Sequence, residues 1–205
     1  ESLVYCNGLH ICVDDRIALL YSCSVSQGIK ITFAALLNGA ALNPFSIRHR
    51  GAAQVADWLI RQEVTIFFSV PVLFREFAAT LTGKEVFPHL RVIQLGSDLV
   101  TPREFQEYQR HFFANTILVL RFGTTETGTV RRMYFESASS LKEIQNAVGY
   151  ATEGAEVCLI DENGAALPCN KVGEILVKSR YLSPGYWRGP ELHQEKFFQD
   201  PNGGQ

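Results

Sequence analysis

"RVIQLGSDLVTPREFQEYQRHFFANTILVLRFG", residues 91–123, contains two apolar runs on either side of an amphipathic segment. The two runs are rich in the aliphatic and β-branched residues that are typical of buried strands. The segment between them begins with Thr101, which favours the helix N-cap, and Pro102, which favours the first helical position. A strand, a helix and a strand in this order predict two parallel strands joined by a crossover helix.

The same alternation extends back to residue 16. Strand-like runs ("RIALLYSC", "AALNPF", "VTIFFSV") alternate there with helix-like ones ("SQGIKITFAALLNGA", "GAAQVADWLIRQE", "VLFREFAATL"). We therefore predict an α/β fold with a doubly wound, mostly parallel sheet flanked by helices. Ligands of such sheets lie beyond the carboxyl ends of the strands, where "LGSD" (95–98) and "RFGTTE" (121–126) are found here.

The pattern changes after residue 128. Further strand-like runs follow without an amphipathic helix between them, and "DENG" at 161–164 is a strong hairpin signal. We expect a small antiparallel β module, a distorted barrel. The predicted division is an α/β part over residues 1–128 and a β-rich part over residues 129–205. Neither end of the chain has a capping element, so we also expect a chain truncated at both ends.

The composition is that of an ordinary globular protein, with 46% hydrophobic and 20% charged residues among 205. A net charge of −2 gives no electrostatic reason to expect nucleic acid or an anionic membrane as partner. Apolar runs fall far short of the roughly 20 residues of a membrane span. The five cysteines form no C-x-x-C pair and the five histidines are scattered. We therefore expect reduced thiols, no Cys or His metal site, and a cytoplasmic location.

The stretch "FGTTE" combines residue types that suit a bound metal–nucleotide. Glycines and threonines offer backbone N–H groups and hydroxyls to phosphate without crowding it. Magnesium on phosphate oxygens needs one or two carboxylates, which Glu126 can supply, and the ring of Phe122 could lie against a base. The alternative is a surface turn with a threonine-rich cap, because a motif this short is common.

The wider context resembles the adenylate-forming superfamily of acyl-CoA synthetases, adenylation domains of peptide synthetases, and luciferases. "RFGTTE" is similar to its aromatic-Gly-x-Thr-Glu loop, and "LGSD" to its Gly-Gly-Glu strand end. "VGEILVKSRYLSPGYWRGPELHQEKF" (172–197) resembles its Gly-Glu strand, Gly-Tyr turn and Pro-Glu segment. "FAALLNGAAL" (33–42) resembles the helix and strand after the acyl-pocket segment. The matches cover nearly the whole chain in order.

The resemblance implies roles for individual residues. Thr125 and Glu126 are the implied catalytic pair: Thr125 would bind the α-phosphate, and Glu126 would hold Mg²⁺. Phe122 would stack on adenine. The implied nucleotide-binding residues are Gly96, Ser97, Asp98, Phe122, Gly123, Thr124 and Thr125. Tyr186 and Trp187 of the Gly-Tyr turn are expected to pack the barrel as structural residues.

The implied reaction is attack of a small carboxylic acid on the α-phosphorus of ATP, giving acyl-AMP and pyrophosphate. Transfer to the thiol of CoA or of a carrier protein's phosphopantetheine would follow. The family's phosphate loop, its ribose-binding Thr-Gly-Asp and its C-terminal domain with a catalytic lysine are not found in the 205 residues. We therefore expect a fragment of the large N-terminal domain with little activity of its own.

The resemblance also gives a substrate pocket. Ser26 occupies the position of the aspartate that pairs with the ammonium in amino-acid-activating members, which disfavours an α-amino acid. The resemblance places Arg121 on the pocket wall and Lys30 near it. Our hypothesis is that these cations suit a substrate with a second acidic or polar group. The alternatives are a structural salt bridge for Arg121 and an exposed helix position for Lys30.

Two other functions remain open at this point. The first is a non-catalytic nucleotide-binding or scaffold domain of the same fold, against which the presence of Thr125 and Glu126 argues. The second is an unrelated flavodoxin-like binding module. The antiparallel segment argues against that module, because a plain doubly wound domain would continue as strand, helix and strand.

Overall fold

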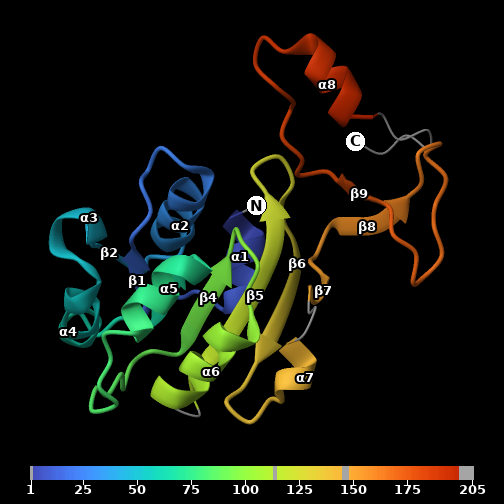
Figure 1. The fold of residues 1–205 in the computed structure, drawn as a ribbon. Helices are drawn as coiled ribbons and strands as arrows, with labels where there is room; N and C mark the ends of the chain where they lie inside the picture. Colours follow the sequence, from blue (N-terminus) through green and yellow to red (C-terminus); the bar gives the residue numbers. More distant parts are fainter. Residues whose placement is uncertain (1, 113–114, 145–147, 199–205) are drawn as a thin grey trace.

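The computed structural model describes residues 2–112, 115–144 and 148–198. Within these ranges a seven-stranded sheet has the order β2-β1-β3-β4-β5-β6-β7 (Figure 1). Its first five strands are parallel: β1 (Arg16–Leu19), β2 (Ala41–Pro44), β3 (Ile66–Ser69), β4 (Val92–Gly96) and β5 (Ile117–Thr124). The chain moves from β1 to β2 on one side and to β3 on the other, which is the topological switch of a doubly wound sheet.

Helices cover both faces of this sheet. They are α1 (Ser2–Leu9), α2 (Ser26–Leu37), α3 (Ile47–Arg50), α4 (Val55–Arg61), α5 (Pro71–Ala78), α6 (Pro102–His111) and α7 (Leu141–Ile144), with a short 3-10 turn at Ala52–Gln54. The remaining helix, α8 (Pro190–Lys196), lies apart from the large sheet (Figure 1). One buried cluster joins α1 and α2 to the sheet, and another joins α4, α5 and α6 to its opposite face. The predicted doubly wound layer is therefore confirmed.

Aromatic rings dominate the core on the α5 and α6 face. Phe74, Phe77 and Phe105 are fully buried, and Phe77 meets Phe67 of β3 edge to face at 5.6 Å between ring centroids. Such rings bury large apolar areas, and edge-to-face pairs add roughly 0.5–1.5 kcal/mol each. This packing makes the sheet a rigid platform for the loops at its carboxyl edge.

The predicted N-cap of α6 is present where the sequence placed it. The Thr101 side chain accepts a hydrogen bond from the Arg103 N–H, and Glu104 returns to the Thr101 backbone, so α6 begins with a capping box. Helix α2 ends at Leu37, and Gly39 has φ of 69° just beyond it. The left-handed conformation at this end explains the glycine of "LLNG".

The antiparallel part begins as predicted, but its first strands belong to the large sheet. β6 (Gly128–Phe135) pairs antiparallel with β5, and β7 (Tyr150–Ala151) pairs with β6. The small antiparallel module is the two-stranded sheet of β8 (Ala155–Ile160) and β9 (Glu174–Ser179), which lies to one side of the large sheet in Figure 1. The boundary between residues 128 and 129 falls within β6, and the division at that point remains a prediction.

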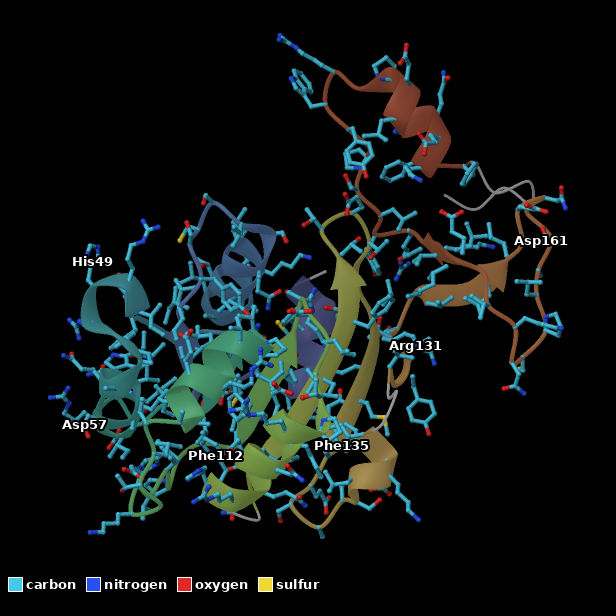
Figure 2. All side chains as sticks on the ribbon, in the orientation of Figure 1. His49, Asp57, Phe112, Arg131, Phe135 and Asp161 are labelled. Carbon is cyan, nitrogen blue, oxygen red and sulfur yellow. The ribbon has the colours of Figure 1, made fainter. Side chains whose placement is uncertain are left out.

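Alternation along β6 separates its two adjacent arginines. Arg132 is buried and packs on α1, with its guanidinium 5.6 Å from the centroid of the Tyr5 ring. The Arg131 Nε instead donates to the carbonyl of Gly149 at 2.9 Å, beside β7 (Figure 2).

None of the helices in the described ranges has the length and apolar character that crossing a bilayer would require.

Candidate functional site

Two threonines build the turn between β5 and β6. The Thr124 N–H donates to the Thr127 hydroxyl at 3.1 Å, and the Thr127 N–H donates to the Thr124 hydroxyl at 3.2 Å. This reciprocal pair closes the turn and leaves Thr125 and Glu126 between them. Thr127 was not among the predicted site residues, although a threonine three residues after another has the spacing of reciprocal side-chain-to-backbone capping.

The glycine of this motif serves the hairpin. A Cβ on Gly123 would lie 1.7 Å from the carbonyl oxygen of Gly128 on the paired strand. The pairing register shifts between Phe122 and Gly123, so a β-bulge lies at this position. Close approach of the two strands is therefore sufficient to explain the glycine. Its contact with a nucleotide stays a prediction.

The Glu126 carboxylate is held by several neighbours. The Tyr186 hydroxyl donates to Glu126 Oε1 at 3.0 Å. The pKa of Glu126 is lowered, first by its own backbone N–H, then by hydrogen bonds from Tyr186 and Thr124, and also by the charge of Lys30. The side chain is therefore an ionised carboxylate at neutral pH, as a metal ligand must be.

The expected roles of Tyr186 and Trp187 are only partly right. Tyr186 contacts the candidate site directly through Glu126, a contact that the sequence gave no signal for because the two residues lie 60 positions apart. The Trp187 side chain is 89% exposed. The expectation that Trp187 packs a barrel is therefore wrong, because its ring projects from the loop before α8 and lies outside the buried clusters.

The ends of β4 and β5 meet at a cavity of about 520 Å³. The predicted site residues that line it are Ser97, Asp98, Arg121, Phe122 and Gly123. The volume lies in the range of small-molecule sites. Ser97 has φ of 69°, an uncommon conformation for a residue with a side chain and one that clusters at functional sites.

A second cavity, of about 290 Å³, lies on the C-terminal side of the turn. Thr124, Glu126 and Thr127 line it together with Tyr186 and Phe197. The structure thus divides seven of the predicted site residues between two cavities, while Gly96, Thr125, Ser26 and Lys30 line neither. Thr124 and Glu126 face the one beside α8, while Phe122 and Gly123 face the one beside β4.

Arg121 is buried at the end of β5, with 9% of its surface exposed. Its Nε donates to the Thr129 hydroxyl at 3.0 Å, and its Nη1 lies 3.5 Å from the Ser97 hydroxyl. These partners are neutral, so the expected alternative of a structural salt bridge has no support among the described residues. A Cβ on Gly96 would lie 2.6 Å from Arg121 Cγ, so this glycine makes room for the arginine.

Helix α2 brings its two predicted residues toward the turn. The Ser26 hydroxyl lies 3.3 Å from the Thr125 hydroxyl, at the first position of the helix. Lys30, one helical turn further on, is only 9% exposed. The alternative of an exposed helix position for Lys30 is therefore wrong. The charge of Lys30 helps to lower the pKa of Glu126.

The arrangement suits magnesium bound to a nucleotide better than an all-protein metal cage. The described residues contain no group of three or more His, Cys, Asp or Glu side chains that could hold a metal ion. Mg²⁺ in nucleotide sites takes one or two carboxylates and otherwise water and phosphate oxygens. The ionised Glu126, with the hydroxyls of Thr125 and Ser26 nearby, fits that donor set.

Comparison with known proteins gives a consistent result. The family model described as "AMP-binding enzyme" matches residues 2–187. Surfactin synthase subunit 2 of Bacillus subtilis (strain 168) is 30% identical over 197 residues, which are 92% of this chain and 5% of that protein. 4-Coumarate–CoA ligase 4 of Arabidopsis thaliana is 30% identical over 139 residues, which are 67% of this chain and 24% of that protein.

Solved structures share the fold. The structure of ATP-bound MatB from Rhodopseudomonas palustris superposes with a TM-score of 0.78 at 22% identity, covering 98% of this chain and 38% of that one. At this identity the likeness concerns the fold alone. The chain therefore spans only 5% and 24% of the lengths of these two curated relatives.

Proposed function

Because this chain belongs to the AMP-binding enzyme family, as its "RFGTTE" motif predicts, we propose that it forms part of an ATP-dependent ligase that activates a carboxylic acid as acyl-AMP. One observation supports this most strongly. The hairpin after β5 presents Thr125 and an ionised Glu126 just after Phe122 and Gly123, which line the cavity at the ends of β4 and β5. This is the edge of a parallel sheet where nucleotides bind.

In the proposed reaction an oxygen of the acid attacks the α-phosphorus of ATP. The bond from that phosphorus to the bridging oxygen breaks, and pyrophosphate leaves with its electron pair. Bound Mg²⁺ would neutralise the phosphate charge, with Glu126 as its protein ligand. The Thr125 hydroxyl would donate to an α-phosphate oxygen, while Phe122 covers the base and Ser97 and Asp98 border it. Catalysis of this kind depends on positioning and charge.

The proposed acid carries a second acidic or polar group. Ser26 places a hydroxyl beside Thr125, and a hydroxyl cannot neutralise an ammonium, so an α-amino acid is disfavoured. Arg121 and Lys30 are both buried near this edge of the sheet, and buried cations favour anionic partners. Burial supports a role in the pocket over an exposed helix position for Lys30, and neutral partners support it over a structural salt bridge for Arg121.

The acceptor of the acyl group is proposed to be a thiol, either of CoA or of the phosphopantetheine of a carrier protein. An ATP-rich, reducing compartment such as the cytoplasm suits this chemistry, and all five cysteines are free. Residues 1–128 would carry most of the nucleotide and acid contacts, and residues 129–205 would form the adjoining β-rich part.

ATP–pyrophosphate exchange over a panel of carboxylic acids tests the proposal, measured with this chain and with the longest protein that contains it. The longer protein is expected to exchange with one class of acid, and Glu126→Ala is expected to reduce the exchange by at least 100-fold, about 2.7 kcal/mol. Exchange unaffected by Glu126→Ala would contradict the proposed metal role. Silence across the whole panel would favour a nucleotide-binding or scaffold function instead.

A further inference from the structure

The segment after β9, residues 180–198, forms an arm that includes α8 and is attached to the turn between β5 and β6 (Figure 1). The Ser183 N–H donates to the Glu126 backbone carbonyl at 2.7 Å. The Tyr186 hydroxyl donates to Glu126 Oε1 at 3.0 Å. Both hydrogen bonds are therefore accepted by Glu126, the residue proposed above as the magnesium ligand.

The Tyr186 ring is fixed by its own arm. It meets Phe197 edge to face at 5.6 Å between centroids, and Phe197 stacks on His193 at 5.0 Å. Gly185 has φ of 114°, and a Cβ there would lie 2.1 Å from His193 Nδ1. The loop before Tyr186 therefore packs closely against α8. This packing fixes the direction from which the Tyr186 hydroxyl reaches Glu126.

Where a metal ion has a single carboxylate ligand, a hydrogen bond from a fixed donor can orient that carboxylate and so raise the metal affinity. A carboxylate has two oxygens and about four lone-pair positions, so one bond to Oε1 leaves capacity for a metal ion. A lone glutamate side chain otherwise samples many rotamers, and ordering it costs free energy at the moment of binding. Partners that orient metal ligands typically change metal affinity by 10–100-fold.

We propose that Tyr186 is a positioning residue that orients the Glu126 carboxylate for the metal ion and couples metal binding to docking of the arm. The proposal rests on the proposed role of Glu126 and extends it to residue 186 and the arm. Metal binding is expected to strengthen docking of the arm, because both require the same orientation of one carboxylate. By linkage, a docked arm is expected to strengthen metal binding by the same factor.

The test uses Mn²⁺ in place of Mg²⁺, with and without ATP, on this chain. Mn²⁺ affinity is measured by water-proton relaxation, and ATP affinity is measured separately in EDTA. Tyr186→Phe is expected to weaken Mn²⁺ binding about 10-fold and to leave metal-free ATP affinity unchanged. Tyr181→Phe is the matched control, since Tyr181 lies on the same arm and its hydroxyl makes no hydrogen bond within the described residues.

Amide hydrogen exchange of residues 182–189 tests the attachment without any ligand. Tyr186→Phe removes the hydrogen bond, and Glu126→Gln weakens it because a neutral amide oxygen replaces the charged acceptor. Each is expected to speed exchange there, and the double variant is expected to match Tyr186→Phe because both changes act on the same contact. Saturating Mn²⁺ should slow exchange of these amides in the wild type and leave it unchanged in Glu126→Gln.

The outcomes separate this proposal from the proposed function. If Glu126→Gln weakens Mn²⁺ binding while Tyr186→Phe matches Tyr181→Phe, Tyr186 has no positioning role but the metal site stands. If the wild type binds Mn²⁺ and Glu126→Gln does not weaken it, both are overturned. Additive effects of Tyr186→Phe and Glu126→Gln on exchange would also overturn the proposed coupling.

Discussion

Gly123→Ala tests whether the close approach of β5 and β6 shapes the candidate site. The added Cβ would lie 1.7 Å from the Gly128 carbonyl oxygen, and real Cβ atoms essentially never come closer than 3.0 Å to another heavy atom. The obstacle is backbone, so no side chain can rotate away, and the two strands must separate. Gly123 has no positive φ, so steric overlap alone decides the result.

We expect Gly123→Ala to lower the free energy of unfolding by about 2–4 kcal/mol, from overpacking and loss of one hairpin hydrogen bond. For a chain of this size that corresponds to a decrease in Tm of about 5–15 °C. Urea unfolding and thermal scans measure it. Gly189→Ala is the control, because its Cβ would lie 3.4 Å from Tyr186 Cβ in ordinary contact and it should cost less than about 1 kcal/mol. Equal stability of the two variants would refute the steric argument.

Three further predictions concern buried polar groups. Burial acts to raise the pKa of Glu104, but hydrogen bonds from Thr101 and Arg75 together outweigh it and lower that pKa. The contribution of Glu104 to stability is therefore complete above the unfolded value of 4.5 and is lost as pH falls through the lower folded pKa. Glu104→Gln should flatten this acid dependence and cost about 1–3 kcal/mol at pH 7 in urea titrations. Tyr108, fully buried, donates to a backbone carbonyl, so Tyr108→Phe should cost about 1–3 kcal/mol in the same assay, and an unchanged midpoint would contradict that. If the proposed acid with a second acidic or polar group is the substrate, Arg121→Met in the longer protein should reduce the preference for it about 10-fold or more in pyrophosphate exchange, and an unchanged acid preference would remove Arg121 from the proposed pocket.

The regular elements were predictable because local signals agree with the packing. "TPRE" at 101–104 specifies the capping box of α6, and "NG" at 38–39 specifies the end of α2. Continuous apolar runs predicted parallel strands because both faces of the sheet are buried. These features depend on neighbouring residues in the chain, and a sequence displays them directly.

The pairing of β6 and β7 with the large sheet depends on contacts between distant residues. The change to antiparallel strands after residue 128 was visible, but nothing local shows whether β6 pairs with β5 or with β8. The contact between Tyr186 and Glu126 is hidden for the same reason. The burial of Lys30 also needed the structure, because a lysine on a helix is most often exposed.

The candidate site was predicted at the strand ends, where the structure has two cavities, although the division of its residues between those cavities was not foreseen. Phe122 and Glu126 lie four residues apart but line different cavities, because the bulge and turn redirect the chain between them. Gly96 and Gly123 have packing explanations that the sequence could not distinguish from room for a phosphate.

The proposed function depends on binding of a magnesium–nucleotide at the carboxyl edge of β4 and β5 through Glu126. Titration of the ¹⁵N-labelled chain with ATP, first in EDTA and then with Mg²⁺, measures this binding through NMR chemical shifts. We expect ATP-dependent shifts at residues 97–98 and 122–125, and a further Mg²⁺-dependent shift at Glu126 and its neighbours. In Glu126→Ala the neighbours should lose the Mg²⁺-dependent shift. Shifts confined to other parts of the sheet, or a Mg²⁺ response that survives Glu126→Ala, would contradict it.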